Sequence, residues 1–352
     1  MENNDYIVIN KQELNTDYVK NRIIEEKESK RDLNQAERIP VQNNILLNPT
    51  FYTSACGFFA AFLGWIITEP LVAMDHRFLI LLSVTMIMFL CASISSVDSF
   101  LSGNFLKGLK TGLIGLLLGL LWGVAGTIIC GLVVGCIRDI CSIVIRPDLK
   151  ADGETIDITL KSVIFCMLGR APGWAVLGLG VGIIPGISNY SMKIGLNGAI
   201  GGMLGGFIGG FIFDPIAFSM GNTSAALSRC IGFGALSILV GFFVGLVENM
   251  AKEVWITMKS GPLRGKQFVI YHNPTLIGSS PRSDIYIFKD PNVMPTHAKI
   301  QKRGSKYEII DDSNGIGVYV NSEKINGSKV LEHKDEIILG QSVLEFQQKE
   351  RG

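Results

Sequence analysis

The stretch 275-TLIGSSPRSDIYIFKDPNVMPTHAKI-300, with 311-DDSNGIGVYVN-321, decides the fold of the C-terminal part of this chain. Short runs of β-branched and aromatic residues alternate here with turn residues. His297 and Ala298 stand between a loop at 290–295 and an alternating strand at 298–300. This pattern predicts a β-sandwich. We expect further strands near 267–271, 306–311, 318–320, 336–339 and 343–346, and a turn at 259–266, KSGPLRGK.

Four short motifs follow one another in an order that is typical of a known family. They are Ile277-Gly278-Ser279, Asp284-Ile285-Tyr286-Ile287, Val293-Met294-Pro295-Thr296-His297-Ala298-Lys299-Ile300 and Gly317-Val318-Tyr319-Val320-Asn321-Ser322. In this order they resemble the forkhead-associated (FHA) domain, a small β-sandwich whose apical loops bind phosphothreonine peptides. The resemblance covers residues 253–352 and implies recognition of a protein partner, without catalysis.

The chain departs from the family at the two residues that chiefly contact phosphate. These are the Arg after the first Gly and the Ser of Val-Ser-x-x-His, and here the positions hold Ser279 and Met294. A phosphate carries a charge of about −1.5 to −2 and is best bound by Arg or by several donors. Arg282, Lys289 and Arg303 lie in or beside the predicted loops. Either they compensate for the lost ligands, or they are simply solvated.

The resemblance also implies roles for individual loop residues. Gly278, His297 and Asn321 would brace the loops, His297 and Asn321 by hydrogen bonding. The partner-binding loops would contain Ser279, Ser280, Arg282, Met294, Thr296, Asn314 and Asn321.

The rest of the chain has the composition of an integral membrane protein. The chain has 352 residues, a mean hydropathy of +0.35 and a net charge of +1, with polar ends and an apolar middle. The charge balance and the lack of a basic stripe with interleaved aromatics predict no nucleic-acid partner. The seven cysteines form no CxxC pair and the four histidines are far apart. No HExxH, nucleophile elbow or kinase loop is present. We therefore expect no enzyme, no metal site and no cofactor.

The membrane region is expected at 50–249, after a charged, solvated tail at 1–49 that lacks the features of a cleaved signal peptide. A span needs about 17 to 25 mostly apolar residues. Six candidates satisfy this rule, and the third and fifth are long enough to tilt or to break into two pieces. They are 51–68, 78–97, 111–136, 171–187, 194–218 and 225–247.

Six spans would place both termini on one side of the cell membrane. Five lysines then share that side, and the positive-inside rule makes it cytoplasmic. They are Lys107, Lys110, Lys193, Lys252 and Lys259. The loop at 137–161 argues against this orientation, because it contains Arg138, Arg146, Lys150 and Lys161.

Glycines at intervals of four form two adjoining stripes in the fifth span. One is Gly198, Gly202, Gly206 and Gly210, and the other is Gly201, Gly205 and Gly209. Such GxxxG stripes let backbones approach closely, within one bundle or between copies in a homo-oligomer. Several residues of the third span also recur 86 positions later, for example Gly115 as Gly201. This suggests that spans two and three are duplicated in spans four and five, a repeat that many transporters have.

Three ionisable residues lie in or at the predicted spans: Arg170, Asp214 and Arg229. The bilayer makes such residues costly, so they suggest function by default. One interpretation places all three at the membrane boundary, with Asp214 paired to an arginine and the helix ending or breaking at Asp214-Pro215. The other is a pathway for an ion or solute.

Three functional hypotheses result. The first is a multi-pass membrane protein that presents a cytoplasmic FHA-like domain to a protein partner, phosphorylated on Thr in one version, in signalling or membrane-complex assembly. The second is a small transporter or channel with a regulatory FHA-like module. The third is an FHA-like domain that has lost phosphate binding and binds partners, or supports self-assembly, without it.

Overall fold

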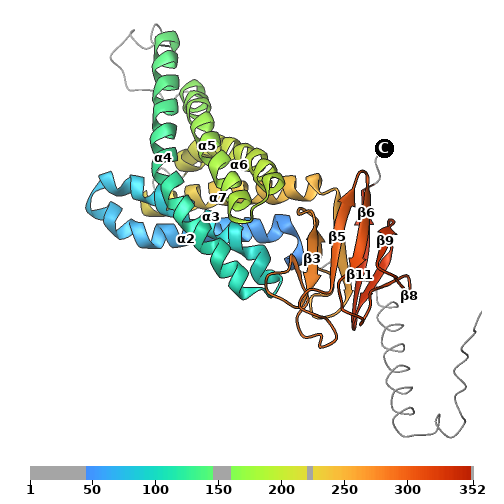
Figure 1. The fold of residues 1–352 in the computed structure, drawn as a ribbon. Helices are drawn as coiled ribbons and strands as arrows, with labels where there is room; N and C mark the ends of the chain where they lie inside the picture. The colour runs from blue at the N-terminus through green and yellow to red at the C-terminus, as the bar shows by residue number, and fades with distance from the viewer. Residues whose placement is uncertain (1–44, 146–159, 220–224, 350–352) are drawn as a thin grey trace, which may run out of the picture.

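A computed structural model describes residues 45–145, 160–219 and 225–349 of the chain (Figure 1). Six long helices come first: α2 (Pro49–Met74), α3 (Leu79–Leu101), α4 (Phe105–Ile145), α5 (Leu160–Ser188), α6 (Met192–Ser219) and α7 (Ala225–Ala251). Two short 3-10 turns, η2 (Ile45–Leu47) and η3 (His76–Phe78), precede α2 and α3. The predicted tail at 1–49 and the loop at 137–161 fall largely outside the described residues.

Six of the described helices are long and apolar enough to cross a membrane. This confirms the prediction of six long apolar segments. α4 and α6 are each continuous, so the third and fifth spans do not break. The prediction that a helix ends or breaks at Pro215 is wrong, because α6 continues to Ser219. A proline removes one backbone donor, and helices of membrane proteins tolerate this when neighbouring groups satisfy the freed carbonyl.

The two glycine stripes of α6 pack against two different helices. A Cβ atom at Gly202 would lie 2.1 Å from the carbonyl oxygen of Gly178 in α5. A Cβ atom at Gly205, on the other stripe, would lie 2.6 Å from the Cα atom of Val240 in α7. Only residues without side chains allow backbones to approach this closely. Both stripes are therefore occupied within the chain, which leaves neither as a seam for a second copy.

The hairpin α3–α4 has a structural counterpart in α5–α6. Gly115 packs on the carbonyl oxygen of Cys91 as Gly202 does on that of Gly178, and both residues of the second pair lie 87 positions after the first. The turns match with the same offset in their backbone hydrogen bonds. Ser102 N to Asp98 O corresponds to Asn189 N to Pro185 O. Gly103 N to Phe100 O corresponds to Tyr190 N to Ile187 O. Asn104 N to Ser99 O corresponds to Ser191 N to Gly186 O. The predicted offset of 86 holds for Gly112 on Ser96 and Gly198 on Gly182, whereas the turns and the pair Gly115–Cys91 follow an offset of 87.

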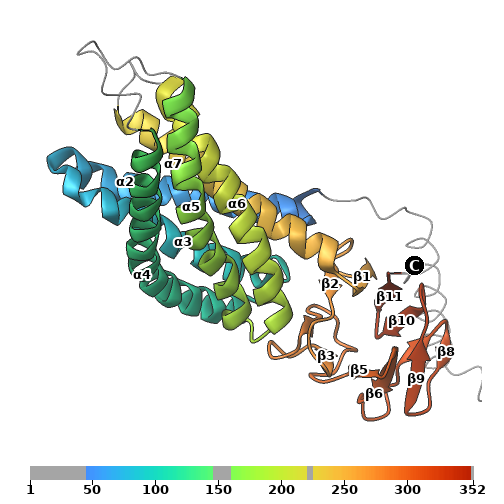
Figure 2. The same cartoon turned by 90° about the horizontal axis from the view of Figure 1, so that it is seen from above.

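The C-terminal part is an all-β sandwich of two sheets (Figures 1 and 2). The first sheet has the order β2-β1-β11-β10-β7-β8 and the second β4-β3-β5-β6-β9. The strands are β1 (Val254–Ser260), β2 (Gln267–Val269), β3 (Thr275–Gly278), β4 (Ile285–Tyr286), β5 (Ala298–Arg303), β6 (Lys306–Asp311), β7 (Tyr319–Val320), β8 (Glu323–Lys324), β9 (Ser328–Leu331), β10 (Glu336–Leu339) and β11 (Ser342–Gln348). The fold is therefore the predicted one, six long apolar helices followed by an FHA-like sandwich.

The core of the sandwich follows from the alternation of side chains along the strands. Ile300 in β5 pairs with Ile309 in β6, and both are fully buried. From the other sheet, Ile256 in β1 and Phe346 in β11 are paired and fully buried.

The sandwich is attached directly to the bundle. β1 begins at Val254, only two residues after α7 ends at Ala251. In Figure 2 the sandwich lies at the end of α7, close to the turns that join α3 to α4 and α5 to α6. Several contacts described below join the two parts at this place.

Candidate functional site

Three loops at one end of the sandwich are joined by hydrogen bonds. They are 279–284 between β3 and β4, 287–297 between β4 and β5, and 312–318 between β6 and β7. His297 joins the second loop to the third. Its Nδ1 accepts from the backbone N–H of Met294 at 3.1 Å, and its Nε2 lies 3.3 Å from the carbonyl oxygen of Gly317. These partners require a neutral imidazole to carry its proton on Nε2.

Gly278 and the serines after it join the first loop to the second. A Cβ atom at Gly278 would lie 2.2 Å from the carbonyl oxygen of Pro295, so the two loops approach here at backbone distance. The hydroxyl of Ser279 donates to the carbonyl oxygen of Val293 at 2.8 Å, and its N–H donates to that of Met294 at 2.9 Å. Both donors of Ser279 are thus used inside the loop cluster, which leaves neither to replace the arginine of the family.

The groups that remain for a partner are side chains on the outside of the cluster. Arg282, Thr296 and Asn314 are exposed, and among the described residues the guanidinium of Arg282 has no ion pair. The backbone N–H of Arg282 donates to the hydroxyl of Ser280 at 3.2 Å, which fixes the loop but leaves the side chain free. Met294 is half-buried. The cluster therefore offers two exposed cations, Arg282 and Lys289, and several neutral polar groups.

Asn321 lies outside this cluster, in the turn between β7 and β8. Its Nδ2 donates to Asp335 at 2.8 Å, and its Oδ1 accepts from the backbone N–H of Glu336 at 2.9 Å. Its backbone has φ of 54°. The side chain therefore holds a neighbouring turn, and both of its polar atoms have protein partners.

Asp311 organises the third loop. Its Oδ1 accepts from the backbone N–H of Ser313 at 2.8 Å, and its Oδ2 accepts from that of Val318 at 3.3 Å. Burial alone would raise the pKa of this carboxyl, but the hydrogen bonds from Ser313 and Val318 outweigh it and lower the pKa. The carboxylate is thus charged and holds both ends of the loop.

The first loop also contacts the helical bundle. The side-chain amide of Asn104, in the turn between α3 and α4, donates to the carbonyl oxygen of Pro281 at 2.6 Å. The ring of Phe288 covers Gly103 in the same turn, where a Cβ atom would lie 2.5 Å from the ring. Two of the candidate binding loops, through Pro281 and Phe288, therefore contact the bundle.

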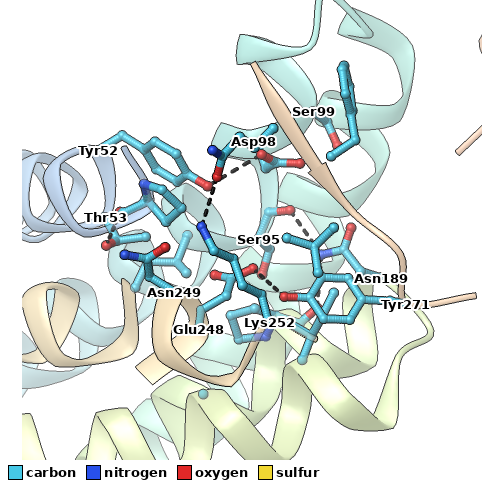
Figure 3. Close-up of a pocket in the computed structure, with 18 of the residues that line it drawn as sticks. Tyr52, Thr53, Ser95, Asp98, Ser99, Asn189, Glu248, Asn249, Lys252 and Tyr271 are labelled. Atoms are coloured by element: carbon cyan, nitrogen blue, oxygen red, sulfur yellow. Dashed lines mark hydrogen bonds between the residues drawn. The ribbon is translucent and has the colours of Figure 1, made fainter. Parts of the chain in front are cut away.

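A network of charged side chains forms the rest of this junction (Figure 3). Lys266, the last residue of the predicted turn at 259–266, donates from Nζ to Asp98 of α3 at 2.6 Å. The hydroxyl of Tyr52 in α2 lies 3.3 Å from the same carboxylate. Tyr271 donates to Glu248 of α7 at 3.1 Å. Burial and the neighbouring Glu248 raise the pKa of Tyr271, so its hydroxyl is protonated and able to donate.

His272 and Asp284 form a second pair at the junction, with 2.9 Å between Nδ1 and Oδ1. The hydrogen bond that His272 donates to Asp284 raises the pKa of His272. Burial opposes ionisation of Asp284, but the bonds from His272 and from the backbone N–H of Leu276 hold its pKa below the usual range. The pair is charged when His272 is protonated.

The arginines singled out in the spans lie toward the ends of their helices that are remote from the sandwich. Arg229 forms a bidentate pair with Glu69 of α2, with 3.1 Å between Nε and Oε2. Glu69 is thus the partner of Arg229, and the predicted pairing of Asp214 with an arginine stays a prediction. Arg170 lies over the ring of Phe213, 5.8 Å from its centre. The side chain of Asp214 lies outside the described part of the structure.

Comparisons with known proteins concern the C-terminal part. A family model described as "Inner membrane component of T3SS, cytoplasmic domain" matches residues 258–350. An oxoglutarate dehydrogenase inhibitor of Corynebacterium jeikeium (strain K411) is 38% identical over 102 residues, which are 29% of this chain and 67% of that protein. The glycogen accumulation regulator GarA of Mycolicibacterium smegmatis is 33% identical over 91 residues, 26% of this chain and 56% of that protein.

Solved FHA domains also match. One, from work described as "Structural and functional analysis of phosphothreonine-dependent FHA domain interactions", is 20% identical, with a TM-score of 0.26, and covers 28% of this chain and 99% of that one. The chain spans about two thirds or less of the length of the two curated relatives named above.

Proposed function

Because this chain belongs, through its C-terminal domain, to the FHA family, we propose that it is a membrane protein that presents this domain in the cytoplasm as a docking module for protein partners. The six apolar helices would be its membrane anchor, with residues 1–49 and 253–352 on the cytoplasmic side. The relatives named above are an inhibitor and a regulator, which supports a role in regulation more than in catalysis.

The observation that carries this proposal is the cluster of three loops held together by His297 and Ser279. A rigid cluster loses little conformational entropy when it binds, so its exposed groups can contribute to affinity. Arg282, Thr296 and Asn314 are these groups. The partner would dock across them.

Recognition of phosphothreonine would depend on Arg282. A guanidinium binds phosphate through two parallel hydrogen bonds, and such charge-assisted bonds are about twice as strong as neutral ones. Ser279 cannot share this role, since its hydroxyl donates to Val293. Met294 brings no charge. Arg282 would therefore be the bidentate phosphate ligand of the cluster, with Lys289 as a second cation. Thr296 and Asn314 would be neutral donors.

The test measures binding of the full chain in nanodiscs to a phosphothreonine peptide library and to the same peptides without phosphate. We expect selective binding of phosphopeptides, weakened about tenfold or more by Arg282→Ala, which is near the 1.5–3 kcal/mol of a charged hydrogen bond. Arg303→Ala is the matched control, because this exposed arginine pairs with Glu308 at the far end of β5. Equal binding with and without phosphate would instead support phosphate-independent docking, and no binding at all would contradict the proposal.

The orientation is tested separately by labelling a cysteine placed at Ala151. Six spans with a cytoplasmic sandwich require this position to be on the opposite side of the membrane. Labelling from the cytoplasmic side would contradict the orientation.

A further inference from the structure

A cavity of about 130 Å³ lies at the junction between the bundle and the sandwich. All six long helices contribute to its wall, and the sandwich contributes residues between Lys266 and Thr275 together with Asp284 and Ile285. Since a single water needs about 10–15 Å³ of such volume, there is room for several waters or for a small solute. Figure 3 shows Tyr52, Asp98, Glu248 and Tyr271 around this space.

Most charged groups at the wall of the cavity have a partner in the protein. Asp98 binds Lys266, and Asp284 binds His272. Lys252 donates to the side-chain carbonyl of Gln267 at 2.8 Å. Pairing of this kind offsets the cost of taking charges out of water.

Lys252 has only the neutral amide of Gln267 as its hydrogen-bond partner, and two further charged groups at the wall are also without an ion pair in the described part of the chain. Glu248 accepts the hydrogen bond from Tyr271 but has no cation within 4 Å. Lys107 of α4 has no carboxylate within 4 Å of its Nζ. Both side chains are half-buried and come from different helices, so they bring one negative and one positive charge to the same space.

We propose that this cavity binds a small zwitterion, with its ammonium group on Glu248 and its acidic group on Lys107. Such a ligand supplies the missing partner to both residues at once and adds no net charge to a site where unpaired charge is costly. A ligand with only an ammonium group would pair with Glu248 alone, and a ligand with only an acidic group would pair with Lys107 alone. The site is distinct from the partner-binding loops, because Arg282, Thr296 and Asn314 do not line it.

The position of the cavity allows two sources of the same chemistry, a free amino acid or the headgroup of an ethanolamine phospholipid. Both carry an ammonium group and an acidic group. The shared feature is the pair of charges, and the experiment separates the sources.

The test uses the full chain in nanodiscs of phosphatidylglycerol alone and measures binding of glycine and L-serine by calorimetry. Ethanolamine and acetate serve as probes that each lack one charge. We expect at least one of the amino acids to bind and to bind at least tenfold more tightly than either single-charge probe. Glu248→Gln and Lys107→Met should each weaken binding at least tenfold. Lys110→Met is the matched control, because this exposed lysine of α4 lies over Tyr190 and does not line the cavity.

A second arm replaces the lipid with phosphatidylethanolamine. Amino acids can fail to bind in phosphatidylglycerol because the natural ligand is a headgroup. In that case mass spectrometry should detect ethanolamine lipid bound to the wild type, and no such lipid bound to Glu248→Gln or Lys107→Met. The inference is overturned if both variants bind amino acids, or retain ethanolamine lipid, as the wild type does. It is also overturned if the wild type binds neither the amino acids nor the ethanolamine lipid. Each variant is first checked for an unchanged melting temperature, and Lys107→Met provides the test if Glu248→Gln does not fold.

Discussion

The ion pair between Lys266 and Asp98 should decide how firmly the FHA-like domain is held against the bundle. The side chain of Lys266 is only 2% exposed, whereas that of Asp98 is 62% exposed. Breaking a buried ion pair costs about 3–5 kcal/mol and breaking an exposed one about 0–1 kcal/mol. For Asp98→Asn, which removes the charge and keeps the shape, we expect an intermediate cost of about 2 kcal/mol. This corresponds to an undocked population about 30-fold larger.

Pulsed electron-spin distance measurements can detect this change, with spin labels at Lys110 in α4 and Ser305 in the sandwich, in a background without native cysteines. The wild type should give one narrow distance, and Asp98→Asn should add a second, broad population. Asp312→Asn is the control, since Asp312 forms a partly exposed pair with Lys299 within the sandwich. The reasoning is refuted if Asp98→Asn keeps the narrow distance or if Asp312→Asn broadens it equally.

Two further predictions concern the glycine packing and the histidine pair. Gly202→Ala should lower the melting temperature in detergent, because its Cβ would lie 2.1 Å from the carbonyl oxygen of Gly178, while Gly131→Ala, with no atom within 4 Å, should be neutral or stabilise by up to about 1 kcal/mol. NMR titration should find the pKa of His272 above its usual value, and Asp284→Asn should lower it. The stability that this bond contributes is present below about pH 6.5 and is lost as the pH rises through the raised pKa.

The architecture could be predicted from sequence because both parts have strong local patterns. Long apolar segments need no partner to be recognised as helices of membrane length. In the sandwich, alternation placed β6 and β10 at the residues where the structure has them. The family motif also pointed to the loop containing His297, which bonds to nearby Met294 and to Gly317, and both partners lie within or beside the motifs.

The offset of the internal repeat shows where sequence patterns become ambiguous. The two stripes of α6 adjoin, so Gly115 of α4 can be aligned with Gly201 or with Gly202. Sequence identity favoured the alignment of Gly115 with Gly201, but Gly201 packs on α7. Contacts select Gly202, because it packs on α5 as Gly115 packs on α3. Only the partner helix distinguishes two faces that have the same composition.

The junction could not be predicted because its residues are far apart in sequence and unremarkable in isolation. Asp98 and Glu248 each stand near the end of an apolar helix, where a charged residue usually faces water. Lys266 stands in a turn, where the same expectation holds. Only the docking of the sandwich on α3 buries the Lys266 side chain and brings it to Asp98. A charge at the end of a span, next to a domain joined by a short connection, is the signal that could have indicated this contact.

This docking has a consequence for the partner-binding loops. Asn104 holds the loop of Arg282 through the carbonyl oxygen of Pro281, and Lys266 holds the sandwich through Asp98. A partner that binds Arg282 therefore meets a loop whose position depends on α3 and α4. By linkage, a solute that changes the packing of these helices at the cavity would change partner affinity, and the partner would change solute affinity by the same factor. The membrane bundle would then have a role in recognition beyond that of an anchor.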